Sequence, residues 1–441
     1  MNMKSFEALA NEVRMMRPVR PVGRVVSAGH GIVTVGGLHN DAALGDHVRL
    51  EASGGALRGE VVNVSGEGVA ILPDGPGDGI RIGDPVVLKG APVIAPSDHW
   101  IGRIIDPYGQ SLDGRNPGRG LIERPLRARP PVATLRRQLG ERLATGLAVF
   151  DTLLPLVRGQ RMGIFSGSGV GKSTLLGKLA REVECDVVVV ALVGERGREV
   201  REFVESTLGP EGMRKSVVVA ATSDQPPLTR RRAMWTAMSV AEHFRDQGRH
   251  VLFLADSVTR FAEAHREVAL AAGEASSLRG FPPSTAHQIM ALAERAGPGH
   301  VDTGGDITAI FTVLVAGSDM EEPVADILRG VLDGHVILDR QIAERGRFPA
   351  VDLLRSVSRS LPEAASAPEN DLIRLARQRL GAYDRAEVMI QAGLYASGSD
   401  AEVDAAISVY PLLDAFLAEP SPDGPGDAFA RLREILARRR I

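Results

Sequence analysis

The sequence is poor in cysteine, in aromatic residues and in long apolar runs. Its single cysteine, Cys185, excludes a disulfide framework and a cysteine-rich zinc site. Aromatic residues make up only 4% of the chain, too few for a surface on which bases stack. The longest apolar run, Val187 to Val193, is far shorter than the ~20 residues of a membrane-spanning helix. Charged residues also interrupt the N-terminus where a secretion signal would be apolar, so we expect a cytoplasmic protein.

Charge of neither sign dominates the chain. It has 52 basic and 55 acidic residues and a formal net charge of −3, which gives no basic footprint for duplex nucleic acid. Apolar residues make up 44% and charged residues 24%, which is ordinary globular composition and excludes a disordered chain. A length of 441 residues favours about three domains.

The first 91 residues divide into two segments. In residues 1–20, Phe6, Leu9, Val13 and Met16 have helical spacing, which predicts an amphipathic helix before Pro18. This helix could pack on its own domain or dock a partner, and the spacing leaves both open. Residues 21–91 predict a small β-barrel, because six short valine-rich segments alternate with Gly- and Pro-containing turns (22–26, 32–35, 47–50, 59–64, 69–72 and 85–88).

Residues 92–362 change to an α/β pattern. Apolar strand candidates alternate with helical stretches, which predicts a mainly parallel sheet with helices on both faces (161–165, 186–193, 216–221, 250–255 and 310–315). The Ser-, Ala- and Pro-rich stretch 360–368 indicates a boundary. Residues 363–441 are expected to be helical, with one helix start marked by the capping pattern of Ser399 and Glu402.

A phosphate-binding loop is predicted between a strand and a helix. Its glycines allow backbone N–H groups to point at phosphates, and the helix N-terminus adds positive potential. Lys172 would reach the β- and γ-phosphates, and the Ser173 hydroxyl would bind magnesium. Ser166 replaces the first glycine of the general pattern, at a strand end where glycine is not required. The binding residues are Gly167, Ser168, Gly169, Val170, Gly171, Lys172, Ser173 and Thr174.

Two carboxylates stand at the ends of other predicted strands. Asp256 ends the apolar segment 251–256, as in the Walker B pattern, where the aspartate holds the metal. Glu195 follows the apolar segment 187–193, which we expect beside the strand of the phosphate loop, and could polarise a water molecule. A salt bridge between Glu195 and a nearby arginine is the alternative that the sequence leaves open.

Taken together, these segments resemble the catalytic subunits of type III export ATPases, within the rotary ATPase family. The resemblance begins at about Pro21 and follows the family order of barrel, RecA-like core and helical C-terminal domain. It is strongest with the flagellum-specific branch. The segments that carry it are Gly-Ser-Gly-Val-Gly-Lys-Ser (167–173), Val-Gly-Glu-Arg-Gly-Arg-Glu (193–199), Ala-Thr-Ser-Asp-Gln-Pro-Pro (221–227), Leu-Ala-Asp-Ser-Val-Thr-Arg-Phe-Ala (254–262) and Phe-Pro-Ala-Val-Asp (348–352).

The resemblance implies roles that the residues alone do not. It implies that Glu195 is the catalytic carboxylate and that Arg359 is an arginine finger, inserted into a neighbour's site in a homohexamer. It also implies that Phe348 and Tyr395 enclose adenine. The cofactors implied are ATP and Mg²⁺. Arg196 and Arg260 match secondary positions near the γ-phosphate, although structural salt bridges would also explain them.

The implied function is ATP hydrolysis that energises export through a type III apparatus, with flagellar assembly favoured over an injectisome. Expected partners are a stator-like regulatory protein at residues 1–20, a central stalk protein, the export gate and chaperone–substrate complexes. The protein would then associate with the inner membrane only through these partners. The alternatives are a rotary ATP synthase subunit, a Rho-like RNA translocase and a nucleotide-gated scaffold without a motor function. The near absence of aromatic residues in the barrel argues against RNA.

Overall fold

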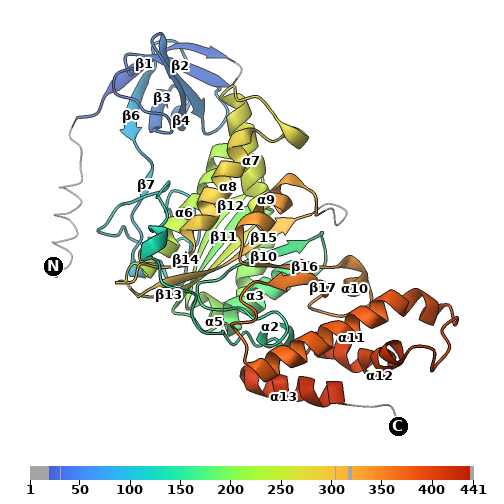
Figure 1. Ribbon diagram of the computed structural model, residues 1–441. Helices are drawn as coiled ribbons and strands as arrows, with labels where there is room; N and C mark the ends of the chain where they lie inside the picture. The colour runs from blue at the N-terminus through green and yellow to red at the C-terminus, as the bar shows by residue number, and fades with distance from the viewer. Residues whose placement is uncertain (1–18, 30, 303, 316–319, 438–441) are drawn as a thin grey trace.

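The computed structural model describes residues 19–437, except residue 30, residue 303 and residues 316–319. A β-barrel, a helix-covered sheet and a group of C-terminal helices follow one another along the chain (Figure 1). The predicted fold class is therefore confirmed. The predicted amphipathic helix of residues 1–17 lies outside the described residues.

The barrel consists of six antiparallel strands that close in the order β1-β2-β5-β4-β3-β6. Side chains alternate between the interior and the surface, and buried Val35, Leu50 and Ile71 help to fill the interior. Closure leaves no strand edge exposed. The strands are β1 (Val22–Gly29), β2 (Ile32–Gly36), β3 (His47–Ala52), β4 (Gly55–Ser65), β5 (Gly68–Pro73) and β6 (Pro85–Gly90).

The central sheet has nine strands, eight of them in the order β17-β16-β10-β15-β13-β11-β12-β8. The five predicted strands form its middle. Strands β8 and β14 escape prediction because they are three and two residues long, and β17 because its sequence mixes polar and apolar residues. The strands are β8 (Arg103–Ile105), β10 (Arg161–Ser166), β11 (Val187–Glu195), β12 (Ser216–Thr222), β13 (His250–Asp256), β14 (Gly297–Pro298), β15 (Asp306–Leu314), β16 (Gly334–Leu338) and β17 (Val351–Ser358), while β7 (Val93–Ile94) pairs separately with β9 (Arg124–Pro125).

Helices cover both faces of this sheet (Figure 1). In β11, Val189 and Ala191 pack on the face of α6, whereas Val188 and Val190 pack on the face of α3. A parallel sheet that is buried on both faces requires such a continuous apolar strand. The helices up to β17 are α2 (Ala148–Asp151), α3 (Lys172–Glu182), α4 (Gly197–Glu202), α5 (Gly209–Met213), α6 (Pro227–Arg245), α7 (Val258–Ala271), α8 (Pro283–Arg295), α9 (Pro323–Val331) and α10 (Arg340–Glu344).

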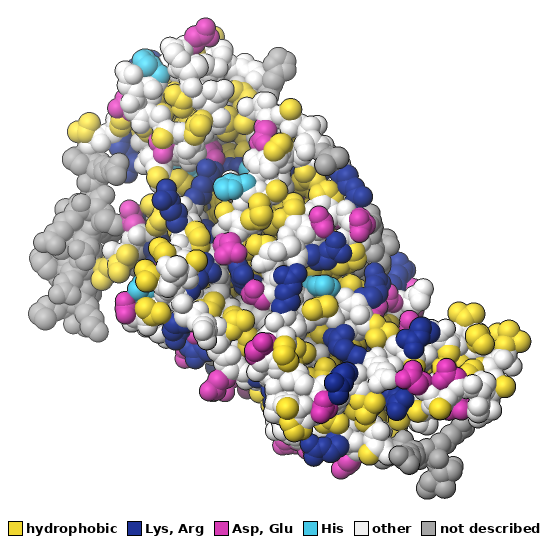
Figure 2. Space-filling view, in the orientation of Figure 1, with side chains coloured by type: hydrophobic (Ala, Val, Ile, Leu, Met, Phe, Trp, Pro, Cys, Tyr) yellow, Lys and Arg dark blue, Asp and Glu magenta, His cyan; other side chains and the backbone are white. Residues whose placement is uncertain are grey.

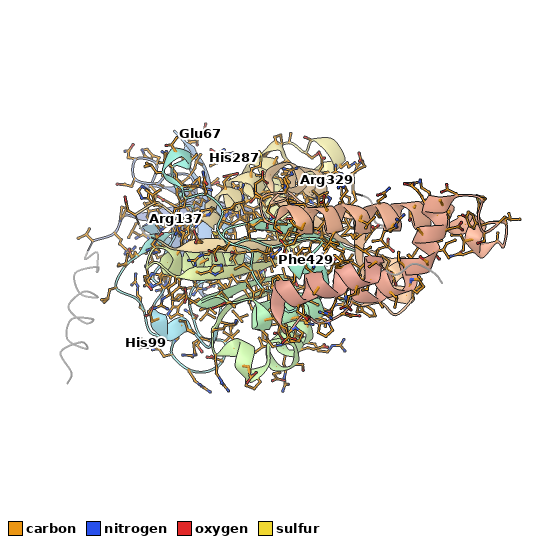
Figure 3. The ribbon with its side chains drawn as sticks, turned by 60° about the horizontal axis from the view of Figure 1, so that its bottom comes forward. Glu67, His99, Arg137, His287, Arg329 and Phe429 are labelled. Atoms are coloured by element: carbon orange, nitrogen blue, oxygen red, sulfur yellow. The ribbon has the colours of Figure 1, made fainter. Side chains whose placement is uncertain are left out.

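Helices α11 (Ala367–Gln391), α12 (Ala401–Phe416) and α13 (Gly424–Ala437) lie together at one end of the molecule (Figures 1 and 3). Buried Phe429 of α13 belongs to the same core as α3. The capping prediction for α12 was wrong by one residue. Asp400 is the N-cap, because its carboxylate accepts from the backbone N–H groups of Glu402 and Val403, while the Ser399 hydroxyl donates to the carbonyl of Ala396 instead.

The molecular surface carries charges of both signs. On the face drawn in Figure 2, basic and acidic side chains are interspersed over the core rather than gathered by sign. Within the described part of the chain, no helix combines the length and the apolar character that crossing a bilayer requires.

Candidate active site

The phosphate loop connects β10 to α3 at the carboxyl edge of the sheet. Gly169 and Gly171 have φ angles of 78° and 83°, which L-residues rarely adopt. A Cβ atom at Gly171 would also lie 3.1 Å from Phe348 Cδ1, so a side chain there would press on the aromatic ring. Ser166 is the last residue of β10, and its strand conformation explains why glycine is not needed there.

Lys172 and Asp256 form an ion pair beneath the loop. The Lys172 Nζ atom contacts Asp256 Oδ1 and lies 3.9 Å from Glu195 Oε1. The Thr312 hydroxyl donates to the same oxygen of Asp256 at 2.8 Å. Because only 3% of the Asp256 side chain is exposed, the ammonium and hydroxyl groups compensate its charge in place of water.

Glu195 ends β11, which lies between β13 and β12 in the sheet. The expectation that this strand neighbours β10 was wrong, because β13 and β15 lie between them. Burial and the nearby charge of Asp256 raise the pKa of Glu195 to about 7, although the Lys172 ammonium acts in the opposite direction. A carboxyl group with a pKa near neutrality is suited to accept a proton or to orient a water molecule. The structure thus places a weakly basic group close to the phosphate loop.

Lys172 and Glu195 border a cavity of about 740 Å³, whereas the buried Asp256 is not part of its wall. Its wall comes from strand carboxyl ends and helix N-termini, where ligands bind in open α/β sheets. Every predicted loop residue from 167 to 174 lines the cavity except Val170, which is buried in the core. The wall also includes Glu195, Arg196, Glu199, Ser223, Arg230, Thr259, Arg260 and Glu263.

The oxygen donors at this edge suit magnesium. Ser173 lines the cavity, and the Asp256 carboxylate lies against Lys172. Magnesium prefers hard oxygen ligands and usually takes one or two from protein, with phosphate and water completing its shell. The donor set therefore fits a magnesium nucleotide. The described residues contain no cluster of three or more His, Cys, Asp or Glu side chains that could hold a metal without a nucleotide.

The amino-acid sequence is similar to those of known proteins over nearly the whole chain. Residues 146–358 match the nucleotide-binding domain of the ATP synthase alpha/beta family, and residues 365–423 match the C-terminal domain of the T3SS ATPase EscN. Over 441 residues the chain is 45% identical to the flagellum-specific ATP synthase of Caulobacter vibrioides, covering 98% of this chain and 99% of that protein. It is 40% identical to the type 3 secretion system ATPase of Xanthomonas euvesicatoria, covering 94% and 93%.

A solved structure agrees with these relatives. The assembled ATPase EscN of the enteropathogenic E. coli type III secretion system matches with a TM-score of 0.84 and 36% identity. The match covers 94% of this chain and all of that one. The chain belongs to the family of flagellum-specific and type III secretion ATPases.

Membership of this export-ATPase family confirms the prediction of an ATP-binding ATPase of the type III export branch. It favours that branch over an RNA translocase and over a synthase subunit. The individual catalytic roles remain predictions, and the structure shows where each residue lies.

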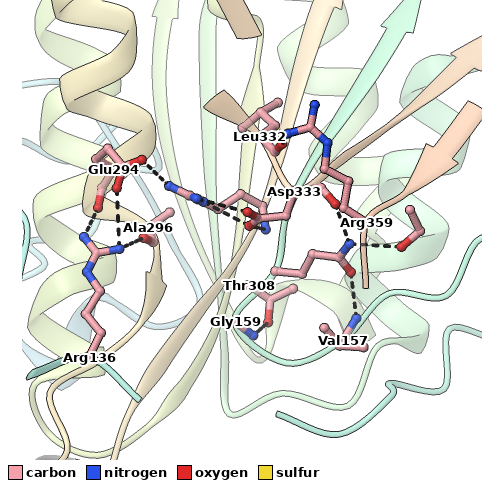
Figure 4. Close-up of polar contacts among 12 residues, drawn as sticks. Arg136, Val157, Gly159, Glu294, Ala296, Thr308, Leu332, Asp333 and Arg359 are labelled. Atoms are coloured by element: carbon pink, nitrogen blue, oxygen red, sulfur yellow. Dashed lines mark hydrogen bonds and ion pairs between the residues drawn. The ribbon is translucent and has the colours of Figure 1, made fainter. Parts of the chain in front are cut away.

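Arg359 lies outside the cavity of its own chain. Its guanidinium donates to the carbonyl oxygen of Leu332, just beyond the end of α9, at 3.1 Å (Figure 4). It also donates to the carbonyl oxygen of Arg329, in the last turn of α9, at 3.1 Å. The backbone N–H of Arg359 donates to the carbonyl oxygen of Asp333 at 3.0 Å. The export-ATPase chain therefore does not complete its cavity with its own Arg359 in this conformation.

The two aromatic residues predicted to enclose adenine lie in different places. Phe348 is 51% exposed and lies against the phosphate loop at Gly171. Tyr395 lies in the turn between α11 and α12, where its hydroxyl donates to the Asp400 carbonyl and the Asp404 carboxylate. It does not line the cavity. The structure thus brings Phe348, but not Tyr395, to the loop, and Phe348 is not part of the cavity wall either.

Several cavity residues were not assigned a role from the sequence. Glu199, Ser223 and Arg230 line the wall. Ser223 directly follows β12, so the rule that ligands bind at strand carboxyl ends could have identified it. Arg196 and Arg260 also reach the wall, but each forms a local ion pair, with Glu199 and Glu263 respectively.

Proposed function

We propose that this chain hydrolyses Mg-ATP as one subunit of a homohexameric ring that energises protein export in flagellar assembly. The observation that carries the proposal is that Lys172, in the cavity wall, contacts the buried Asp256 and lies 3.9 Å from Glu195, while Arg359 lies outside the cavity. Lys172 would bind phosphate, Asp256 would hold the metal and Glu195 would orient water. The cation for the transition state, Arg359, would come from a neighbouring subunit.

The phosphate loop holds the nucleotide in this proposal. Backbone N–H groups of residues 167–174 and the N-terminus of α3 surround the β- and γ-phosphates. Lys172 exchanges its contact with Asp256 for the γ-phosphate, which releases the carboxylate. Ser173 and Asp256 would hold Mg²⁺, which would supply positive charge to the phosphate oxygens when bound. Phe348, with Tyr395 after a rearrangement of the α11–α12 turn, would contact adenine.

Glu195 orients the attacking water. Its carboxylate must be ionised to accept a hydrogen bond from that water, and its pKa of about 7 leaves it poised near neutral pH. In the arrangement that the structure shows, the Lys172 ammonium lies 3.9 Å from Glu195 and favours the ionised carboxylate. The roles of Lys172 and Glu195 are therefore distinct, since one binds phosphate and the other activates water.

Arg359 acts on a neighbouring subunit. An arginine finger in trans stabilises charge on the transferred phosphoryl group and typically contributes about 10³- to 10⁵-fold in rate. Release of the two carbonyl contacts near the end of α9 would free the guanidinium for this role. Isolated subunits should then be poor enzymes.

The partners are part of the proposal, and a related structure supports one of them. A related structure is described as EscN in complex with its central stalk EscO. We extend this to a central stalk protein for the present ring, together with a stator-like protein at residues 1–20, the export gate and chaperone–substrate complexes. Such contacts would place the ring in the cytoplasm, peripheral to the inner membrane. Injectisome export is the second candidate, supported by the Xanthomonas relative.

Specific ATPase activity as a function of protein concentration tests the proposal. We expect activity per subunit to rise steeply as rings assemble, and to be unaffected by added RNA. Activity that is flat with concentration and requires RNA would contradict the proposal and favour a nucleic-acid translocase.

A further inference from the structure

Buried polar contacts join the barrel to the first turns of α6. We call this group the barrel latch: Glu60 and Asp74 on the barrel, Thr229 and Arg231 on α6. The Thr229 hydroxyl lies 2.9 and 2.7 Å from the two carboxylate oxygens of Asp74. Arg231 donates to Glu60 at 2.6 Å. Thr229 and Arg231 are 7% and 3% exposed, so little water competes for these contacts.

Helix α6 begins without a capping side chain. Its N-cap is Pro226, which forms no side-chain hydrogen bond to the helix. The first turn of such a helix has unsatisfied N–H groups and frays easily. Asp74 places a negative charge beside this turn, where the helix dipole favours it. Asp74 therefore stabilises this turn through its charge and through its hydrogen bond with the Thr229 hydroxyl.

The same turn reaches the cavity. Arg230 stands between Thr229 and Arg231 and lines the cavity wall. Its Nε donates to the Gln225 carbonyl at 3.0 Å, which ties the helix to the preceding loop. In that loop, the Ser223 N–H donates to the backbone carbonyl of Glu195 at 3.0 Å.

We infer that Asp74 is a positioning residue for ATP hydrolysis. It holds the first turn of α6, and through it Arg230 and the loop that bonds to Glu195, in the arrangement that the cavity requires. The inference rests on the proposed function, because it concerns the group that orients water. Asp74 does not line the cavity, so its loss should affect turnover more than nucleotide affinity.

The test compares latch variants with a matched variant at the other end of the same helix. Asp74→Ala and Thr229→Val should each lower kcat roughly 5- to 10-fold, because the catalytic groups lose their alignment. KM for ATP should stay within about 2-fold of wild type. Thr229→Ser keeps the hydroxyl and should retain kcat. Glu242→Gln weakens the buried pair with Arg295 (2.7 Å), so it should lower the thermal midpoint but leave kcat unchanged.

All variants are assayed at protein concentrations above which the wild-type activity per subunit no longer rises. Ring assembly then does not limit the measured kcat. Equal losses of kcat in Thr229→Val and Glu242→Gln would overturn the inference and assign the latch to general stability. Wild-type kcat in Thr229→Val would also overturn it. Should Asp74→Ala fail to fold, the Thr229→Val and Thr229→Ser pair decides the question. A wild-type chain without ATPase activity would instead refute the proposed function.

Discussion

Glu195 at the cavity and Glu60 in the barrel latch are both glutamates beside basic side chains, yet their pKa values shift in opposite directions. At Glu60, burial opposes ionisation, but the charges of Arg231 and Arg127 outweigh it and lower the pKa. At Glu195, burial and Asp256 outweigh Lys172 and raise the pKa to about 7.

The difference lies in how many cations each carboxylate receives. Glu60 accepts hydrogen bonds from two guanidinium groups, at 2.6 and 2.7 Å. Glu195 has only the Lys172 ammonium, at 3.9 Å, and that ammonium also pairs with Asp256. The carboxylate that joins the barrel to α6 thus has two cationic partners, whereas the one that we propose orients water has a single cation that it shares with Asp256. Four predictions test this contrast.

Lys172→Ala should give the largest effect. Without the ammonium the γ-phosphate loses its main charge partner, and kcat should fall by roughly 10³-fold or more. Phosphate release measures this loss. Lys178→Ala, on the same helix but outside the cavity wall, is the matched control and should retain activity. Near-normal turnover by Lys172→Ala would refute the phosphate-loop assignment.

Glu195→Gln should bind ATP and lose turnover. The amide has almost the same shape but cannot accept a proton, so kcat should fall by about 10²- to 10³-fold. Nucleotide affinity measured by a fluorescent analogue should change little. Glu202→Gln, an exposed residue of α4, serves as the control. If Glu195→Gln retained wild-type kcat, Glu195 would have a structural role only.

Glu60→Ala should affect stability instead. It leaves two arginines near the domain junction without their carboxylate, and removing one partner of a buried pair typically costs about 3 kcal/mol. A lower midpoint in urea denaturation would show this. Glu51→Ala removes the exposed pair with Arg49 and should cost less than about 1 kcal/mol. Equal effects of the two variants would mean that the latch contributes no more than a surface pair.

The smallest effect should come from pH, and it separates the two glutamates. Because hydrolysis needs ionised Glu195, kcat/KM should fall about tenfold per pH unit below its pKa of about 7. Glu60 has a lowered pKa in the folded state, so its stabilising contribution is complete above the ordinary value of 4.5 and is lost as pH falls below it. At pH 5.5 the protein should therefore be folded but nearly inactive. If structure and activity were lost at the same pH, the proposed difference between the pKa values of Glu195 and Glu60 would be contradicted.

The sequence alone was sufficient to predict those parts of the site that a local sequence pattern identifies. The phosphate loop, Asp256 and Glu195 each end or follow an apolar strand, and the common direction of parallel strands puts their carboxyl ends at one edge of the sheet. The six barrel strands were predictable because glycine- and proline-containing turns separate them.

Contacts between residues far apart in the chain could not be predicted in this way. Thr229 meets Asp74 across 155 residues, and Arg231 meets Glu60 across 171. No local pattern specifies such pairs, since they depend on how the barrel sits on α6. Tyr395 illustrates the same limit, because its position depends on the turn between two helices rather than on its motif.

The most direct test of the account mixes two inactive variants. Lys172→Ala has a defective pocket and an intact Arg359, whereas Arg359→Ala has the reverse. If the active site forms between subunits, random mixing in equal amounts should give a competent pocket and finger at about a quarter of the ring interfaces. We predict that the mixture regains ATPase activity that neither variant shows alone. No recovery in mixed rings, with assembly confirmed by mass photometry, would contradict a site completed in trans by Arg359.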